Sequence, residues 1–210
     1  MQLYHQIFEG IPSSDLKTLF DVVQLQIREY PKGSLLLSQD EENSYIRILK
    51  QGNAHAVRYT SDGREVDFAY LQAGDLFADA LALSLGHRSP VSIYADCDCT
   101  VAMFSYGLLL ESRHPYACHV LKNLAEELAE KFFALQQRLH YITQPSLREK
   151  IMVYLNDCKQ GSGEEFFLVP LDRKAMASFL CSDRSALCRE LSALKRDGII
   201  DFYKNRFRIL

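Results

Sequence analysis

The stretch from Leu171 to Ile200, LDRKAMASFLCSDRSALCRELSALKRDGII, decides how the C-terminal part of this chain folds. It predicts two short helices joined by a tight turn. Asp172 stands where the first helix needs an N-cap, and Ser182 or Asp183 can cap the second. Apolar residues recur at helical spacing in both segments, and Gly198 can end the second helix. This arrangement is typical of a helix-turn-helix.

The second helix separates its apolar residues from its basic residues. One face comprises Ala186, Leu187, Leu191 and Leu194. The opposite, solvent-facing side begins with Arg184, Ser185 and Arg189. Arginines near the start of a helix that can enter the major groove read the O6 and N7 atoms of guanine. The pattern therefore predicts a DNA-reading helix, while a helical hairpin with a solvated basic face remains the alternative.

Charge is divided unevenly along the chain. Residues 1–147 carry 12 Lys+Arg and 18 Asp+Glu, whereas residues 148–210 carry 12 and 9. Only the C-terminal part has the net positive charge that a phosphate backbone attracts.

Composition favours an ordinary cytoplasmic protein of one or two domains. The chain has 210 residues, contains no apolar run long enough to cross a membrane, and begins without a signal-peptide pattern. Its six cysteines form no C-x-x-C pair, which favours reduced thiols over a disulfide framework. We therefore expect a cytoplasmic location and no membrane partner.

The N-terminal half has the alternation of a β-domain. After a short helix within residues 3–21, apolar residues recur every second position, and turns fall at Gly52, Gly63 and Gly74. Short strands are expected at 23–27, 35–37, 45–49, 54–59, 66–71, 91–94 and 100–104. This spacing predicts an antiparallel barrel or sandwich, interrupted by a short helix over residues 76–85.

A helix is expected directly before the segment Arg88-Ser89. Backbone N–H groups of a helix end, together with a guanidinium and a hydroxyl, can form an anion cradle. A surface loop with a solvated arginine is the alternative.

The longest predicted helix covers residues 116–142, which contain no Gly or Pro. Its apolar or small residues follow a period close to 3.5: Ala117, Leu121, Leu124, Leu128, Leu135, Leu139 and Ile142. A helix of this length in a small protein usually needs a partner to cover it, so we expect dimerisation. Packing against its own barrel alone is the alternative.

Pro145 ends this helix, and the segment 143–146 is the predicted hinge. The expected domains are residues 1–112, a dimerisation helix and hinge at 113–144, and residues 145–210. The last domain should contain a helix at 147–156, a loop at 161–164, a strand at 166–170 and a hairpin over 199–210. Lys204 and Arg206 near the hairpin tip could contact phosphates, which would make this a winged helix-turn-helix.

This order of elements resembles the Crp/Fnr family, the bacterial transcription regulators related to the cyclic-AMP receptor protein. The likeness covers essentially the whole chain. Its marks are Ile7-Phe8-Glu9-Gly10-Ile11-Pro12 with Asp15-Leu16, the glycines Gly33, Gly52, Gly63 and Gly74, the run Gly74-Asp75-Leu76-Phe77, and residues 171–200. The resemblance implies an α+β fold: an N-terminal double-stranded β-helix of the cyclic-nucleotide-binding type (a β-roll), a long dimerisation helix and a C-terminal winged helix-turn-helix.

The resemblance also assigns a function and DNA contacts. It implies a homodimer that binds a palindromic double-stranded DNA site and works with RNA polymerase. Arg184, Ser185 and Arg189 align with the family's base-contacting positions, and Asp172 aligns with a backbone-contacting one. With the neighbouring cations, the expected DNA-binding set is Arg184, Ser185, Arg189, Asp172, Arg173, Lys204 and Arg206.

The nucleotide pocket departs from the family pattern. The family's phosphate-binding cassette begins with Gly-Glu and ends with Arg-Ser, but here Ala78-Asp79 replaces the first pair while Arg88-Ser89 keeps the second. Where cyclic-AMP responders carry a Thr-Ser pair on the long helix, this chain has Phe132 and Phe133. We therefore expect an unidentified apolar or aromatic effector other than cyclic AMP, with an anionic group near Arg88. The candidate effector residues are Asp79, Arg88, Ser89, Phe132 and Phe133.

Other chemistries compete with this interpretation. No cysteine precedes Cys97, so the N-terminal iron–sulfur cluster of the oxygen-sensing branch is not expected. Haem ligation by His87, metal binding by His114, Cys118 and His119, and a thiol switch at Cys181 and Cys188 remain alternatives. A ligand-sensing module whose hairpin docks a protein partner is a further alternative. Catalytic motifs are lacking, so we predict that the chain is not an enzyme, and the sequence identifies no certain cofactor.

Overall fold

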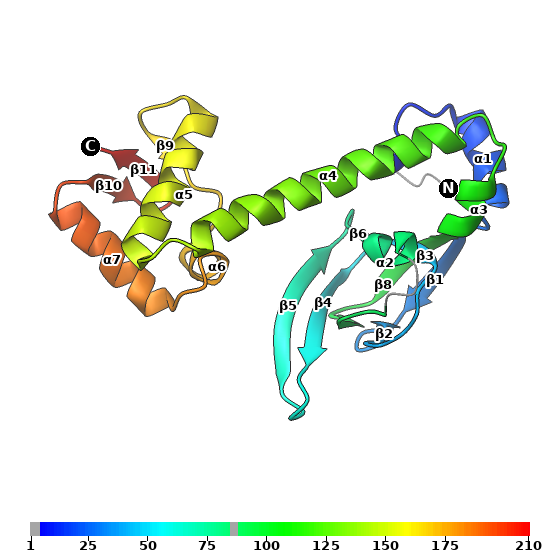
Figure 1. Cartoon of the computed structure of the whole chain (residues 1–210), viewed down its shortest axis with the longest axis horizontal. Helices are drawn as coiled ribbons and strands as arrows, with labels where there is room; N and C mark the ends of the chain where they lie inside the picture. The colour runs from blue at the N-terminus through cyan, green and yellow to red at the C-terminus, as the bar shows by residue number, and fades with distance from the viewer. Residues whose placement is uncertain (1–4, 85–87) are drawn as a thin grey trace. The chain divides into compact units, whose positions relative to one another are not determined.

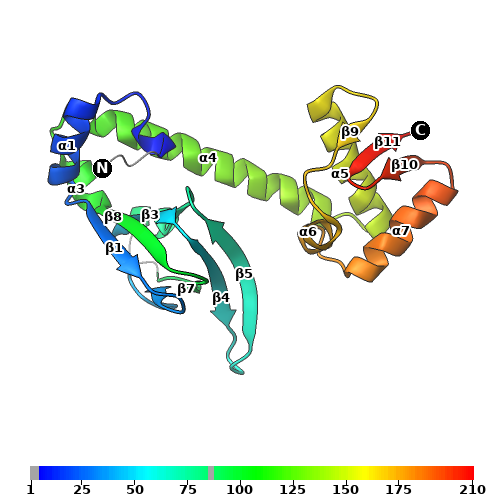
Figure 2. The same cartoon turned by 180° about the vertical axis from the view of Figure 1, so that it is seen from behind.

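The computed structural model describes residues 5–84 and 88–210. The chain forms two compact units, Met1–Leu128 and Ala129–Leu210, and the long helix α4 (Ala117–Ile142) runs through the point at which they divide. Figures 1 and 2 show each unit from two sides.

The first unit is a β-roll of two four-stranded sheets. The sheets have the strand orders β1-β8-β3-β6 and β2-β7-β4-β5, and the pairs are antiparallel. The strands are β1 (Gln26–Tyr30), β2 (Leu35–Leu37), β3 (Tyr45–Gln51), β4 (Asn53–Tyr59), β5 (Glu65–Gln72), β6 (Leu76–Phe77), β7 (Ser92–Ala95) and β8 (Cys99–Ser105). The helical elements are η1 (Gln6–Phe8), α1 (Ser13–Val22), α2 (Asp79–Leu83), α3 (Tyr106–Glu111) and the first part of α4.

Strand β3 separates two apolar cores. Ile46 and Ile48 belong to a core shared with α1, α3 and the start of α4. Leu49 belongs to a second core, which is formed by the facing residues of the two sheets. Successive side chains of a strand point to opposite faces, so Arg47 shares the face of Leu49 and points between the sheets.

Two glycines allow close approaches in this unit. Gly10 has φ +79°, and a Cβ there would lie 3.0 Å from His119 Nε2 on α4. Gly52, at the β3–β4 turn, has φ +94°, and a Cβ there would lie 2.6 Å from Cys99 Sγ. Only glycine meets both the backbone and the space requirement at these positions.

The two parts of α4 have different surroundings. Ala117, Val120 and Leu124 are buried in the core of the β-roll. Towards the C-terminus Phe132, Phe133, Leu135 and Leu139 are 54%, 65%, 56% and 47% exposed. The apolar stripe read from the sequence therefore covers the chain's own domain at its start and is uncovered along most of its remainder.

The second unit is a winged helix-turn-helix domain. It contains the end of α4, then α5 (Leu147–Ser162), β9 (Phe167–Leu168), α6 (Arg173–Phe179), α7 (Arg184–Arg196), β10 (Ile200–Tyr203) and β11 (Arg206–Ile209). The sheet order is β10-β11-β9. Ser146 and Glu149 form a capping box at the start of α5. Tyr141 of α4 is buried in the core with Tyr154 and Phe179, so the last turn of α4 is anchored in this unit.

The structure differs from the sequence expectations at several element boundaries. Residues 76–77 form strand β6 rather than the first turn of a helix, and α2 covers only Asp79–Leu83. Helix α5 continues to Ser162 and ends at Gly163, where a loop was expected from residue 161. Helix α3 was not predicted, and β9 is shorter than the strand expected at 166–170. The anticipated order of β-roll, long helix and winged helix-turn-helix is confirmed.

Candidate nucleic-acid interface and effector site

The turn between α6 and α7 is built from local hydrogen bonds. Asp172 caps α6, because its carboxylate accepts a hydrogen bond of 2.8 Å from the Ala175 N–H. This bond lowers the pKa of Asp172. Cys181 takes the left-handed conformation (φ +51°) that the turn requires. Asp183 is the N-cap residue of α7, but its side chain makes no capping hydrogen bond. The Asp183 carboxylate therefore does not occupy the N–H groups of the first turn of α7.

Helix α7 presents a basic stripe to solvent. Leu187, Leu191 and Leu194 are buried on one side. The opposite side exposes Ser185, Arg189, Ser192 and Arg196, which recur at helical spacing, with Arg184 beside them at the first position. Within residues 5–84 and 88–210, neither Arg184 nor Arg189 makes an ion pair or a hydrogen bond. The Arg184 charge does act on the Asp172 carboxylate and helps to lower its pKa, but both guanidinium groups are exposed and can meet a ligand from outside.

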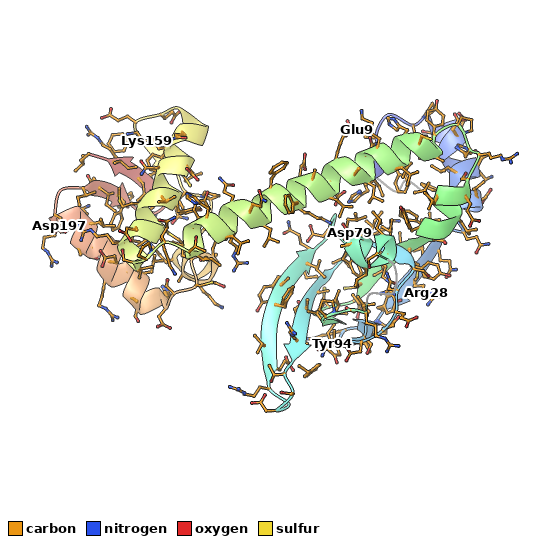
Figure 3. The ribbon with its side chains drawn as sticks, in the orientation of Figure 1. Glu9, Arg28, Asp79, Tyr94, Lys159 and Asp197 are labelled. Carbon is orange, nitrogen blue, oxygen red and sulfur yellow. The ribbon has the colours of Figure 1, made fainter. Side chains whose placement is uncertain are left out.

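Arg148, which was not among the residues predicted from the sequence, fixes the position of α7. From α5 it contacts Glu190 (Nη1 to Oε1, 3.4 Å) and Asp197 (Nη2 to Oδ2, 2.5 Å), at the middle and the end of α7. Figure 3 labels Asp197. The only sequence signal was an arginine in the first turn of α5, a place that the helix dipole does not favour.

The wing carries further cations at its tip. Lys204 and Arg206 are exposed at the turn between β10 and β11, and Lys204 has φ +52°. Lys195 of α7 binds Asp201 of β10 at 2.6 Å and so joins the reading helix to the wing. This bond lowers the pKa of Asp201.

Arg173 occupies a different position from the other predicted DNA contacts. Its Nη2 donates to the Lys204 carbonyl at 2.7 Å, and its guanidinium stacks over Phe207 (4.8 Å) and Phe202 (5.2 Å). Burial lowers the pKa of Arg173. Arg173 therefore joins α6 to the wing, whereas Arg184 and Arg189 extend into solvent.

In the β-roll, the predicted effector residues differ in their exposure to solvent. Asp79, at the start of α2 and labelled in Figure 3, is 6% exposed. Ser89 is fully buried and donates to the Val91 carbonyl at 2.7 Å. Arg88 is largely exposed, and its Nη2 lies 3.1 Å from Glu42 Oε1 while its Nη1 donates to the Asp40 carbonyl. Arg88 thus already has an anionic partner within the protein.

The remaining candidate residues for effector, metal or haem binding have other neighbours. Phe132 and Phe133 lie in the second unit and are more than half exposed. The His114 ring is hydrogen-bonded to Thr18 (2.9 Å), and His119 Nε2 to the Glu9 carbonyl (2.7 Å). Figure 3 labels Glu9. His87 lies outside the described residues.

The described residues offer little to the competing metal chemistries. In that part of the chain, no group of three or more His, Cys, Asp or Glu side chains is placed to hold a metal ion. None of its helices combines the length and apolar character needed to cross a membrane. All six cysteines are free thiols, and Cys181 is exposed in the helix-turn-helix turn.

Comparison with known families identifies both units. Residues 27–112 match the cyclic nucleotide-binding domain, and residues 149–210 match the Crp-like helix-turn-helix domain. The chain is a member of the Crp/Fnr family of transcription regulators. Both matched segments coincide with folded parts described above, and the first ends close to the C-terminus of α3.

Relatives of this Crp/Fnr regulator match most of its length at low identity. A probable transcriptional regulator flp of Lacticaseibacillus casei is 22% identical, covering 87% of this chain and 82% of the relative. The cyclic AMP receptor protein of Thermus thermophilus is 24% identical, covering 92% and 87%. Among solved structures, OCPA-complexed CprK is similar with a TM-score of 0.60 and 20% identity, covering 94% and 92%. The structural likeness supports the fold.

Proposed function

We propose that this Crp/Fnr regulator binds a palindromic DNA site as a homodimer and responds to a small molecule in its β-roll. The observation that carries the proposal is the pair of exposed arginines without ion-pair partners, Arg184 and Arg189, on α7 of a helix-turn-helix. Guanidinium groups at the start of such a helix have the donor geometry for guanine. Lys204 and Arg206 at the wing tip and the free N–H groups of α7 would fix the register on phosphates.

The uncovered part of α4 supports the homodimer. Phe132, Leu135, Leu139 and Ile142 follow steps of three and four, which is the spacing of a two-stranded coiled-coil seam. A second copy of α4 packed in parallel would cover these side chains. It would also bring two copies of α7 to one side of the DNA, about 34 Å apart.

The effector would not be cyclic AMP. The Gly-Glu pair of the family's cassette is Ala78-Asp79 here, and Arg88 is already paired with Glu42. Phe132 and Phe133 replace the polar pair of the cyclic-AMP responders, and each adenine nitrogen left without a hydrogen-bond partner would cost about 1 to 3 kcal/mol. Isothermal titration should detect no binding of cyclic AMP at micromolar concentrations, and micromolar binding would refute this part of the proposal.

The further elements of the proposed mechanism follow from the family and the fold. Effector binding would shift the helix α4 and the hinge at residues 143–146 between two arrangements of the DNA-binding domains. RNA polymerase would be the protein partner at the promoter. The regulator would act in the cytoplasm, where its DNA lies, and it would carry out no catalysis of its own.

Selection from a library of random DNA duplexes tests the proposal without a known target. The full-length protein should enrich a palindrome whose half-sites lie one helical turn apart. Fluorescence anisotropy should then show binding to that duplex at least about a thousandfold tighter than to a random duplex at the same salt concentration. Failure to enrich any sequence, or equal affinity for both duplexes, would contradict sequence-specific binding.

A further inference from the structure

Arg138 projects from the last two turns of α4 towards the helix-turn-helix. Its Nε donates a hydrogen bond of 3.3 Å to the Phe179 carbonyl, and its Nη2 lies 3.5 Å from the Ser178 carbonyl. The guanidinium also lies over the Phe179 ring, 5.5 Å from its centroid. Figures 1 and 2 show the end of α4 beside α6. Arg138 therefore connects α4 to the first helix of the helix-turn-helix.

The carbonyl groups that Arg138 contacts lie where α6 ends. The last carbonyls of a helix have no N–H partner further along the same helix, and an arginine side chain can donate to them. Phe179 is the last residue of α6. Two residues later, Cys181 takes the left-handed conformation (φ +51°) that turns the chain towards α7. Arg138 thus holds the segment that sets the angle between α6 and α7.

Two neighbours of Arg138 tie the same turns of α4 to α5. The Tyr141 hydroxyl donates to Asp157 Oδ2 at 2.8 Å, and Gln137 Nε2 donates to the same oxygen at 3.3 Å. Tyr141 is only 4% exposed. A rotation of the helix-turn-helix about residues 143–146 would have to break these hydrogen bonds as well as the contacts of Arg138.

The same part of α4 carries the proposed dimer seam. Leu139 belongs to that seam and is 47% exposed. Successive residues of a helix lie about 100° apart around its axis, so α4 can present Leu139 to a partner copy while Arg138 holds α6. A single turn of helix therefore links the seam to the DNA-reading unit.

We infer that Arg138 is a positioning residue for DNA recognition, because it holds the end of α6 against α4 and so fixes the direction of α7 relative to the dimer seam. It acts through α6 and needs no contact with DNA. Without it, each reading unit stays folded but turns more freely about residues 143–146. This inference rests on the proposed binding of a palindrome by a homodimer.

The test compares the full-length wild type with Arg138→Ala and with the matched control Gln136→Ala. Gln136 is exposed, lies about 200° around α4 from Arg138, and makes no hydrogen bond within residues 5–84 and 88–210. Fluorescence anisotropy measures binding to the selected palindrome and to a single half-site. Arg138→Ala should bind the half-site within about twofold of the wild type but bind the palindrome about tenfold more weakly, because a freely turning second unit has a lower effective concentration at its half-site. Gln136→Ala should match the wild type on both duplexes.

Amide hydrogen exchange tests the same contacts without DNA. Arg138→Ala should exchange the amides of residues 139–146 about tenfold faster than the wild type, while the amides of α7 keep their wild-type rates. Gln136→Ala should again match the wild type. If circular dichroism shows that Arg138→Ala does not fold, Arg138→Met takes its place with the same expected results, because it keeps an aliphatic chain over Phe179 but has no donor.

Three results would overturn the inference. They are unchanged exchange at residues 139–146, an unchanged affinity of Arg138→Ala for the palindrome, and an equal loss of affinity for the half-site and the palindrome in a folded variant. Failure to enrich any palindrome would instead reject the proposed DNA function, and hydrogen exchange would still decide whether Arg138 holds α6 to α4. Enrichment of a palindrome together with unchanged exchange would reject the role of Arg138 alone.

Discussion

Arginines of the helix-turn-helix unit serve different purposes according to their neighbours. Arg173 is held against Phe207 and the Lys204 carbonyl, so its charge stabilises the joint between α6 and the wing. Arg189 projects from the middle of the exposed stripe of α7 and has no ion-pair partner in the described chain. The same residue type can therefore be assigned a structural role at one position and a recognition role at the other.

Replacing Arg189 by alanine should reduce affinity for the selected palindrome by about 1 to 3 kcal/mol and relax specificity at one base pair of each half-site. A base-contacting arginine contributes to discrimination, whereas a phosphate contact does not. Anisotropy titrations on the palindrome, single-base variants and a random duplex measure the effect.

Lys204→Ala provides the comparison at the wing tip. It should weaken binding to the palindrome and the random duplex alike and reduce the slope of log affinity against log salt by about one. Equal losses on both duplexes for Arg189→Ala would contradict its assignment as a base-reading residue.

Asp172 should make folding of the second unit sensitive to acid. Its pKa is lowered in the folded state by the Ala175 N–H, so its stabilising effect is complete above the unfolded pKa of about 3.9. The effect is lost as the pH falls from there through the folded pKa. Asp172→Asn retains a capping side chain but cannot titrate, so it should show a shallower loss of stability between about pH 5 and 3.

The measurement is urea unfolding followed by circular dichroism across that pH range. Asp172→Ala, which removes the cap, should be less stable than Asp172→Asn at neutral pH. If the free energy of unfolding of Asp172→Asn falls as steeply with decreasing pH as that of the wild type, other carboxylates account for the acid sensitivity.

At the scale of elements, α4 combines two kinds of helix in one continuous segment. Up to Leu124 its apolar side chains complete the core of the β-roll, and from Phe132 to Leu139 they remain exposed. A substitution in the exposed part should therefore affect association without disturbing the fold of either unit.

Leu135→Glu should convert the dimer into a monomer at micromolar concentration, because two added carboxylates would meet at the seam of a parallel pair. Ala134→Glu adds the same charge at an exposed position about 100° around the helix from Leu135, outside the seam, and is the matched control. Light scattering coupled to size-exclusion chromatography gives the mass, and far-ultraviolet circular dichroism checks the fold. A wild type that is monomeric, or a dimeric Leu135→Glu, would contradict the proposed seam.

Element types were predictable where local pattern dominates. Alternation marked β3, β4 and β8, and the long helix lacks breakers, so its start and end were found within one residue. Helix α3 was missed because six residues give too little periodicity to be recognised. Helix α5 extends through Gly161 to Gly163, since the left-handed conformation that ends it (φ +67°) falls at the second glycine.

The candidate sites were predictable only in part, because a local sequence pattern does not show contacts between distant residues. The exposed arginines of α7 follow from helical spacing within one segment. The pairing of Arg88 with Glu42 joins residues 46 positions apart, which no local pattern shows. Arg47 did leave a signal, an arginine within Tyr45-Ile46-Arg47-Ile48-Leu49, but only the folded structure shows that its Nε and Nη1 have no hydrogen-bond partner among the described residues.

At the scale of the whole molecule, a dimer would present two copies of the weakly basic DNA-binding domain. Residues 148–210 carry a net charge of +3 within a chain of −3, so the acidic remainder repels DNA while two basic domains attract it. Attraction confined to these domains favours binding that is oriented with α7 towards the duplex.

The spacing of the half-sites tests whether two copies of α7 act as one rigid pair. Inserting five base pairs between the half-sites of the selected palindrome places the second half-site on the opposite face of the duplex, about half a helical turn away. A dimer joined through α4 then engages only one half-site, so its affinity should fall to that measured for a single half-site. Leu135→Glu lacks the second reading helix from the start, and its affinity should be the same on the original and the spaced palindrome. Equal affinity of the wild-type protein for both duplexes would mean that the two reading helices bind independently, and the α4 seam would then have no role in recognition.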